Sequence, residues 1–342
     1  MLRVGMVDLR GIGHPQCVTQ RDRGTLYRGA VTMLPEAHTE DAFDEICDDE
    51  DALRPGVARL LRRLGVDTAD LTRYPTGSLP VYAAGDRVLK LFPQVHRDEY
   101  PVEAGVLAAV AGNLPIPTPE LYAAGEHDGW GYVLMRRLPG TPLASVWPHL
   151  GPGDRDRLAD QLGLALGVLH SLPLPDIDGW WPTDWAEFMA GQRAACAPRQ
   201  RALGLAPALA EEIPDALAAL RPPTRDPVLL HTEIMAEHLL VDRDSRGWRF
   251  TGLFDFEPAM RGDAEYEFVG VGVFTARGDA RFLRRLLCAY GYSDTELNPA
   301  LSARLLAWSL LHYYSNLPAW LTHLPAMPPT LTAAAADLFP LS

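Results

Sequence analysis

The sequence has 342 residues, 47% of them hydrophobic, and a formal net charge of −13 at pH 7. This apolar share excludes a disordered or fibrous protein, and the acidic balance without a Lys or Arg run argues against nucleic-acid binding. No apolar stretch reaches the roughly 18 residues that a membrane span needs. The four cysteines lack metal or redox spacing. We therefore expect a cytoplasmic protein that binds neither membrane nor nucleic acid.

The N-terminal part of the chain has little hydrophobic periodicity, and residues 1–45 are expected to form an extension. Residues 39–52 are strongly acidic, which is typical of a solvated helix face and also compatible with contact to a cationic substrate. Gly56–Leu64 then has apolar residues at helical spacing and predicts an amphipathic helix.

A strand, a turn and a second strand are predicted over residues 76–92. Lys90 interrupts the second, apolar strand, and a lysine on the inward face of a strand needs an anionic partner. A helix is expected over His96–Val110. On it, Glu103 lies among apolar residues and is the expected partner of Lys90, with Glu99 one turn earlier as the alternative.

The rest of the chain changes from strands to helices. Prolines keep residues 116–122 extended, and a strand pair follows over 122–126 and 130–135. From the helix expected at Asp156–Leu172 onward, helical patterns dominate. This order predicts a two-lobed α+β fold, with a small β-sheet lobe over residues 46–138 and a mainly helical lobe over 139–342.

Polar residues interrupt the helical half where short apolar runs end. Val228–Leu230 and Leu239–Val241 each fit a buried strand. Between them lie His231, Glu233 and His238, and Asp255 follows another apolar run. Carboxylates beside buried strands are costly to desolvate without a cation or hydrogen-bond donors. Two such carboxylates suit phosphoryl transfer, because one can orient a hydroxyl while the other holds Mg²⁺.

This stretch resembles the aminoglycoside phosphotransferase family, which is related to choline kinases and, more distantly, to protein kinases. His231-Thr232-Glu233, four residues and His238 hold the positions of that family's His-Gly-Asp, four residues and Asn. Leu253–Phe256 resembles its later strand end with an Asp. Gly262-Asp263 and Tyr266–Phe268 resemble the following Gly-Asp and acidic segment. The sequence departs from the family pattern at Thr232, Glu233 and His238, and neutral imidazole is a poor ligand for Mg²⁺.

The resemblance implies a protein kinase-like fold that uses ATP or GTP with Mg²⁺ and a small hydroxyl-bearing acceptor. It implies that Lys90, positioned by Glu103, holds the α- and β-phosphates. The residues expected to contact the rest of the nucleotide are Gly77 and Ser78, in a loop over the phosphates, and Met135 and Arg137, at the hinge that reads the base.

The same resemblance assigns the transfer chemistry to the later residues. Glu233 would accept or orient the acceptor hydroxyl, and His231 would brace its loop. Asp255 would hold Mg²⁺, with His238 at the second-metal position. An aminoglycoside-type antibiotic is one acceptor that the family suggests, and the acidic balance weakly favours a cationic one.

Two other interpretations stay open. A nucleotide-binding pseudokinase would show substitutions such as those at Glu233 and His238. A transition-metal site could use ligand types that suit zinc: His231, Glu233, His238 and Asp255.

Overall fold

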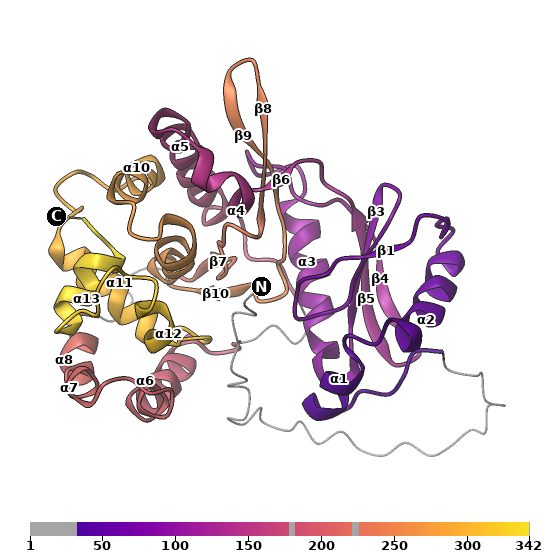
Figure 1. The fold of residues 1–342 in the computed structure, drawn as a ribbon, viewed down its shortest axis with the longest axis horizontal. Helices are drawn as coiled ribbons and strands as arrows, with labels where there is room; N and C mark the ends of the chain where they lie inside the picture. The colour runs from indigo at the N-terminus through magenta and orange to yellow at the C-terminus, as the bar shows by residue number, and fades with distance from the viewer. Residues whose placement is uncertain (1–32, 178–181, 221–225, 342) are drawn as a thin grey trace. The chain divides into compact units, whose positions relative to one another are not determined.

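A computed structural model describes residues 33–177, 182–220 and 226–341. Residues 33–342 form one compact unit that starts at Met33. Residues 1–32 of the expected N-terminal extension lie outside the described part of the chain. The protein combines a small antiparallel sheet with a larger helical region, as the sequence predicts (Figure 1). The exact boundary between the two lobes at residue 138 stays a prediction.

The small lobe is built on a five-stranded antiparallel sheet in the order β1-β2-β3-β5-β4. Its strands are β1 (Thr72–Arg73), β2 (Val81–Ala84), β3 (Arg87–Phe92), β4 (Leu121–His127) and β5 (Trp130–Arg136). The predicted hairpin is present, but β2 begins later than residue 76, because Gly77 has a φ of 120° and Pro80 directly precedes the strand. Lys90 lies at the centre of the sheet, opposite Val81 of β2 and Val133 of β5.

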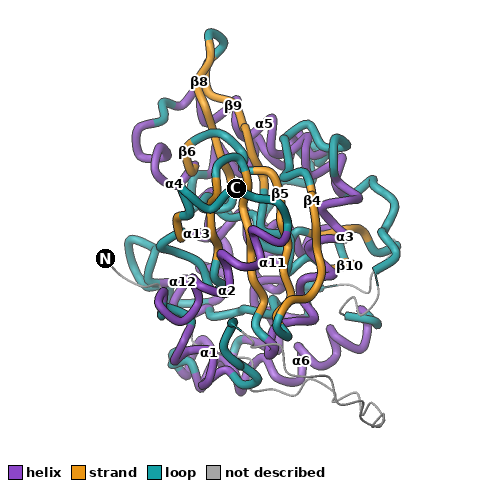
Figure 2. The backbone as a smooth tube through the Cα atoms, turned by 90° about the vertical axis from the view of Figure 1, so that its right-hand side faces the viewer, coloured by secondary structure: helices purple, strands orange, loops and turns teal. Residues whose placement is uncertain are grey.

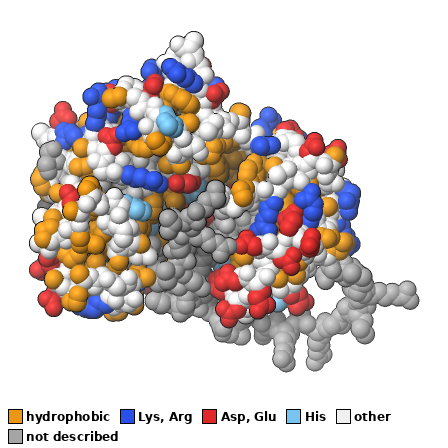
Figure 3. Space-filling model, in the orientation of Figure 1, with side chains coloured by type: hydrophobic (Ala, Val, Ile, Leu, Met, Phe, Trp, Pro, Cys, Tyr) orange, Lys and Arg blue, Asp and Glu red, His pale blue; other side chains and the backbone are white. Residues whose placement is uncertain are grey.

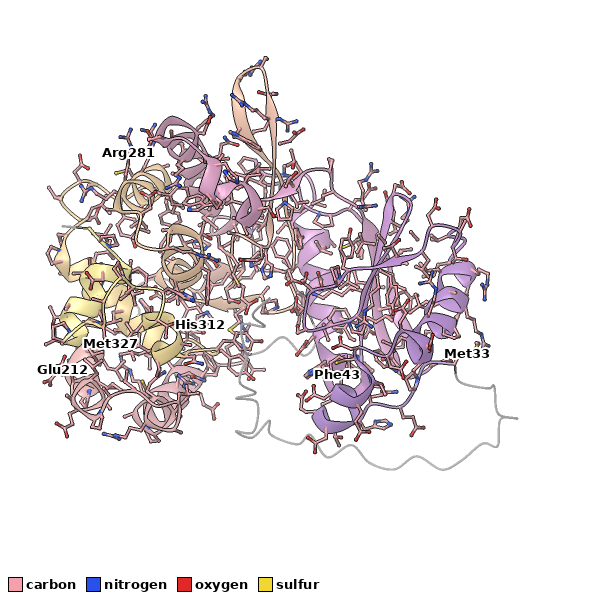
Figure 4. All side chains as sticks on the ribbon, viewed as in Figure 1. Met33, Phe43, Glu212, Arg281, His312 and Met327 are labelled. Atoms are coloured by element: carbon pink, nitrogen blue, oxygen red, sulfur yellow. The ribbon has the colours of Figure 1, made fainter. Side chains whose placement is uncertain are left out.

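Part of the expected extension belongs to the small lobe. Helix α1 (Glu40–Ile46) buries Phe43 against Trp130, with ring centroids 6.2 Å apart, and Figure 4 labels Phe43 beside the sheet. Leu34 is also buried, beneath Gly56 of α2 (Glu50–Arg63). The lobe therefore starts ahead of the expected boundary at residue 46, because these apolar side chains fill its core.

The acidic segment at 39–52 forms the beginnings of two helices rather than one helix face. Thr39 and Asp49 cap α1 and α2, and both first turns are acidic. Negative charge is favourable at helix N-termini, where backbone N–H groups are unpaired. Acidic side chains gather over this region at the lower right of Figure 3. This placement gives the segment a structural explanation.

The helix expected at His96–Val110 is divided in two. A 3₁₀ helix, η1 (Gln94–Glu99), precedes α3 (Tyr100–Val110), and Pro101 lies in the first turn of α3. Proline fits the first turn of an α-helix but cannot continue one from the preceding residues. Glu103 consequently lies in the first turn of α3, where its side chain is fully buried.

The second region is mainly helical. Helix α5 begins before the predicted Asp156, because Pro152 is suited to a first turn. The elements are α4 (Leu143–Val146), η2 (Trp147–His149), α5 (Pro152–Leu169), α6 (Trp185–Ala202), α7 (Pro207–Glu211), α8 (Ile213–Leu217), η3 (Ala264–Glu267), α9 (Phe268–Gly270), the π-helical η4 (Val271–Ala276), α10 (Ala280–Tyr290), α11 (Pro299–Leu311), α12 (Leu317–Leu321) and α13 (Leu331–Leu338). Among the described residues, no helix combines the length and apolar character needed to cross a bilayer.

Short strands in the helical region carry the residues singled out by the sequence. Strand β7 (Val228–Leu230) pairs with β10 (Met260–Gly262), and β8 (Leu239–Asp244) pairs with both β6 (Thr141–Pro142) and β9 (Gly247–Leu253). Figure 2 shows β8 and β9 as a long projecting hairpin. The 231–238 loop joins β7 to β8, and Asp255 follows β9. Their side chains therefore emerge from adjacent strand ends.

Candidate active site

Lys90 is the centre of a buried charged cluster. Its ammonium nitrogen lies 2.9 Å from Glu103 Oε2, 2.5 Å from Asp255 Oδ1 and 2.5 Å from Glu257 Oε2. The residue is 4% exposed, and it is the only lysine in the sequence. We call these four residues the charged cluster. It joins strand β3 and helix α3 of the small lobe to the segment after β9.

The alternative partner for Lys90 is not used. Glu99 instead lies 3.4 Å from His96 Nδ1, on the 3₁₀ turn before α3. The expected contact between Lys90 and Glu103 is present, because Glu103 projects from the first turn of α3 toward the buried side of β3.

Charge and burial oppose each other in the cluster. Burial lowers the pKa of Lys90, but the attraction of Asp255, Glu103 and Glu257 outweighs it and holds that pKa well above its ordinary value. Burial also opposes the ionised form of Asp255, yet Lys90 and the His238 ring lower the pKa of Asp255 below its usual range. Burial and the Asp255 charge raise the pKa of Glu257 well above its usual value. Asp255 is thus the firmly ionised carboxylate of the cluster.

The 231–238 loop is held by hydrogen bonds rather than by charge pairs. Burial lowers the pKa of His231 to about 4, so its ring is neutral near pH 7. His231 Nε2 lies 3.0 Å from the Phe254 carbonyl, and the Glu233 N–H donates to Nδ1 at 3.3 Å. The ring therefore donates through Nε2 and accepts through Nδ1. His231 braces the loop against the segment that leads to Asp255.

Glu267, at the end of η3, accepts two backbone hydrogen bonds from the same loop. The N–H of His231 donates to Oε2 at 2.6 Å, and the N–H of Thr232 donates to Oε1 at 2.8 Å. Its carboxylate is fully buried and also lies 3.4 Å from His170 Nε2. Buried carboxylates that accept such bonds fix backbone geometry, because leaving the N–H groups unpaired would be costly.

Two residues of the site have unusual backbone angles. Thr232 and Asp255 have φ values of 69° and 77°, in the left-handed region. Such conformations cost about 1–3 kcal/mol in a non-glycine residue, and they persist where surrounding contacts enforce them. The contacts of the loop and of the charged cluster therefore hold Thr232 and Asp255 in turns that neither residue favours on its own.

His238 links the loop to Asp255. Its Nδ1 lies 3.0 Å from the Glu233 carbonyl, and its Nε2 lies 3.0 Å from Asp255 Oδ2. His238 therefore connects the backbone of the loop to the carboxylate that follows β9.

Two groups of side chains could hold a divalent cation. The first contains Glu233, His238 and Asp255, and the second contains Glu103, Asp255 and Glu257, with ligand atoms within 4.8 Å of one another in each group. The second offers only oxygen, which Mg²⁺ prefers. His231 belongs to neither group, because its nitrogens face backbone atoms. The four-residue transition-metal site considered from the sequence is therefore not assembled.

The other nucleotide-contact predictions lie on the small lobe. Gly77 and Ser78 are in the loop between β1 and β2. Met135 is buried on β5 opposite Val88, and the N–H of exposed Arg137 donates to the Asp86 carbonyl at 2.9 Å. Within the described part of the chain, none of these four predicted residues contacts Lys90 or Asp255 by a hydrogen bond or ion pair. Their roles stay predictions.

Sequence reasoning missed two contributors to the site, Glu257 and His312. Glu257 gave a signal, because it is a second carboxylate two residues after Asp255. His312, which follows α11 and is labelled in Figure 4, lies 3.3 Å through Nε2 from the Thr232 carbonyl. Its distance along the chain left no local pattern to find.

Solved structures of aminoglycoside kinases share this fold. The GDP complex of wild-type aminoglycoside 2'-phosphotransferase-IIIa superposes with a TM-score of 0.63 at 20% identity, over 80% of this chain and 95% of that chain. The ternary complex of a thermostable APH(4)-Ia mutant with AMP-PNP and hygromycin B gives a TM-score of 0.54 at 19% identity, over 75% of this chain and 87% of that chain. At these identities the likeness establishes a protein kinase-like fold.

Two curated proteins are similar in sequence. The probable ketoamine kinase YniA of Escherichia coli O157:H7 is 25% identical over 203 residues, which cover 57% of this chain and 68% of that protein. The lysine-specific demethylase JMJ21 of Arabidopsis thaliana is 22% identical over 222 residues, or 51% of this chain. The matched region spans only 23% of the plant protein.

A sequence profile gives the family itself. The profile of the phosphotransferase enzyme family matches residues 70–304, which include the charged cluster and the 231–238 loop. The match covers most of the described small lobe and continues into α11. The chain belongs to the phosphotransferase enzyme family.

Proposed function

We propose that the protein transfers the γ-phosphoryl group of ATP or GTP to a hydroxyl group of a small molecule. The observation that carries this proposal is the buried ammonium of Lys90, held between Glu103 on α3 and Asp255 after β9. A lysine with partners on both sides can exchange a carboxylate for phosphate oxygens without being left unpaired. In this role, Gly77, Ser78, Met135 and Arg137 line the rest of the nucleotide site.

The transfer step uses the carboxylate of Glu233. The acceptor oxygen forms a bond to the γ-phosphorus while the bond from that phosphorus to the β–γ bridging oxygen breaks. The nucleoside diphosphate leaves, and the acceptor proton passes to Glu233. His231 supports this step by fixing the backbone of the loop through Phe254 and Glu233.

The donor set at Asp255 fits Mg²⁺ because a firmly ionised carboxylate has further acidic neighbours. Mg²⁺, when bound, neutralises negative charge on the transferring phosphate. Asp255 would hold Mg²⁺ in both of the groups described above. The family resemblance would make His238 the second ligand, whereas the preference of Mg²⁺ for oxygen would make it Glu257.

The acceptor is proposed from the similar proteins and from charge. Solved structures with this fold include complexes with kanamycin and hygromycin B, and a curated relative is a probable ketoamine kinase. The net charge of −13 favours a cationic acceptor. Aminoglycosides are therefore the first acceptors to test, and ketoamines the second.

A nucleotide-binding protein without transfer activity is the second candidate. The observation that favours it is the imidazole of His238 beside Asp255, where Mg²⁺ would prefer oxygen. Retention of the Lys90–Glu103 pair supports nucleotide binding in both candidates.

Thermal unfolding with ATP or GTP, with and without Mg²⁺, tests nucleotide binding. A ligand at 100 times its Kd adds about 2.7 kcal/mol to the free energy of unfolding. We expect a Mg²⁺-dependent rise for one nucleotide in wild type, in Glu233→Gln and in the control Glu237→Gln. Glu237 lies on the same loop but is exposed and paired with Arg277 at 3.2 Å. No rise with either nucleotide would contradict the proposal.

Phosphate transfer to the acceptor panel then separates the two candidates. Transfer by wild type and Glu237→Gln, but not by Glu233→Gln, would establish the role of Glu233. Absence of transfer from all three, despite nucleotide binding, would favour the binding protein.

The single lysine allows a direct measurement of where the nucleotide binds. An amine-reactive reagent can modify only Lys90 and the α-amino group, because the sequence has no other lysine. Mass spectrometry should show that Mg²⁺-nucleotide protects Lys90 while the α-amino group reacts as before. Modification of Lys90 to the same measurable extent with and without nucleotide would place the phosphates elsewhere.

A further inference from the structure

Thr232 occupies a position in the 231–238 loop where glycine would be the default residue. Its φ of 69° is in the left-handed region, which glycine adopts freely and a β-branched residue does not. The residue is 1% exposed. Compared with glycine, threonine is strained at this φ, but it places a methyl and a hydroxyl group in the interior.

Each polar group of Thr232 has a partner from a different segment. Its N–H donates to Glu267 Oε1 at 2.8 Å, and its hydroxyl donates to the Pro258 carbonyl at 3.0 Å. Its carbonyl accepts from His312 Nε2 at 3.3 Å. These contacts connect the loop to η3, to the turn after Asp255 and to the end of α11.

The direction of the His312 contact follows from the ring itself. Burial lowers the pKa of His312 to about 4, so the ring is neutral near pH 7. The Tyr314 N–H donates to Nδ1 at 3.3 Å, which leaves the ring proton on Nε2. The ring also stacks on Tyr266 with centroids 4.7 Å apart. His312 is therefore a fixed donor to the Thr232 carbonyl.

The hydroxyl contact is the one that connects the two catalytic segments. Pro258 lies three residues after Asp255, and Thr232 directly precedes Glu233. Ligand atoms of Glu233 and Asp255 lie within 4.8 Å of each other. The hydrogen bond between Thr232 and Pro258 therefore connects the backbone just before Glu233 to the turn just after Asp255. This connection limits how far the two carboxylates can separate.

We propose that Thr232 is a positioning residue that sets the separation between Glu233 and Asp255 through its hydroxyl bond to Pro258. This inference rests on the proposed function, because it assigns Thr232 a part in phosphoryl transfer. Glycine could adopt the same positive φ and make the same backbone hydrogen bonds. It could not supply the hydroxyl bond to Pro258.

The test compares Thr232→Val with Thr232→Ser, which removes or keeps the hydroxyl. The control is Ser302→Ala, which also loses a buried hydroxyl bond to a backbone carbonyl, that of Phe339 at 2.6 Å. Ser302 lies near the start of α11, whereas His312 follows its end. Hydrogen exchange of amides 233–238 and Mg²⁺-dependent phosphate transfer from ATP and GTP to the acceptor panel are measured on each protein.

Thr232→Val is expected to raise amide exchange in the loop at least tenfold and to lower the rate at saturating nucleotide at least tenfold. The nucleotide concentration for half-maximal rate should change less than twofold, since Lys90 is untouched. Thr232→Ser should restore both values, and Ser302→Ala should change neither. In a Glu233→Gln background, Thr232→Val should lower the residual rate no further.

The inference is overturned if Thr232→Val and Ser302→Ala behave alike. Thr232→Gly guards against a folding failure, because glycine accepts the positive φ. A wild-type rate in Thr232→Gly would also overturn the inference. If wild type transfers no phosphate to any acceptor of the panel, the proposed function fails, and the exchange measurement by itself decides whether the hydroxyl holds the loop.

Discussion

Around Lys90 the site is held by charge, whereas from His231 to His238 it is held mainly by hydrogen bonds to the backbone. The charged cluster places one ammonium among three carboxylates. The loop is instead held by the neutral rings of His231 and His312 and by one carboxylate, Glu267, which pair with backbone groups. Charge pairs can be exchanged for ligand charges, but backbone bonds gain nothing from a ligand. The first region therefore suits binding, and the second suits fixed geometry.

Removing Lys90 breaks the first region and should have the largest effect. Lys90→Met leaves three carboxylates without their cation, and breaking a buried pair costs about 3–5 kcal/mol. The carboxyl pKa values would then rise above those of the unfolded chain. The folded state would bind more protons, so the loss of stability should grow as pH rises. Urea unfolding at about pH 6 and pH 8 measures this trend.

The control for Lys90→Met is Arg97→Met. Arg97 pairs with Glu126 at 3.5 Å on the exposed surface, and such pairs contribute about 0–1 kcal/mol. Added Mg²⁺ should stabilise Lys90→Met more than wild type, because a cation can replace the ammonium among the carboxylates. Equal losses in the two variants would show that the cluster does not depend on Lys90.

The fold and the pairing of Lys90 with Glu103 followed from the sequence because local patterns encode them. Apolar strands and helical spacing predicted the two regions. The apolar neighbours of Glu103 predicted its contact with Lys90, which the structure confirms. The predicted start of the first strand at residue 76 and the single helix predicted over His96–Val110 were wrong, because Pro80 and Pro101 act on single turns.

The supports of the loop could not be predicted in the same way. Thr232 shares its contacts with Pro258 and His312, which lie 26 and 80 residues away. No periodicity relates such positions. The sequence shows that Thr232 directly precedes Glu233. Only the folded structure shows that the hydroxyl of Thr232 bonds to the Pro258 carbonyl, in the turn after Asp255.

Acid tests the comparison, because the two neutral histidines that hold the loop and Glu257 of the charged cluster respond to pH with opposite signs. His231 and His312 have pKa values of about 4 in the folded protein against 6.5 ordinarily. The unfolded state binds more protons between these values, so their contribution is complete above pH 6.5 and is lost as pH falls toward 4. The loss is on the order of 3 kcal/mol for each histidine. The raised pKa of Glu257 acts in the opposite direction.

A comparison of wild type with His312→Asn isolates the contribution of this histidine to the pH dependence of the free energy of unfolding. The variant should lose less stability than wild type between about pH 7 and pH 5 in urea unfolding, because one titrating ring is absent. Parallel pH profiles for the two proteins would show that His312 does not lose its proton on burial.

Thr251→Val should have the smallest effect and gives the reference for Thr232→Val. Thr251 on β9 is 4% exposed, and within the described structure its hydroxyl has no hydrogen-bond partner. A buried unpaired hydroxyl is costly, and valine has the same shape without it. We expect a gain of up to about 1 kcal/mol in urea unfolding, whereas Thr232→Val should lose stability. A loss at Thr251 as large as that at Thr232 would mean that burial of the threonine, rather than its hydroxyl bond, accounts for both.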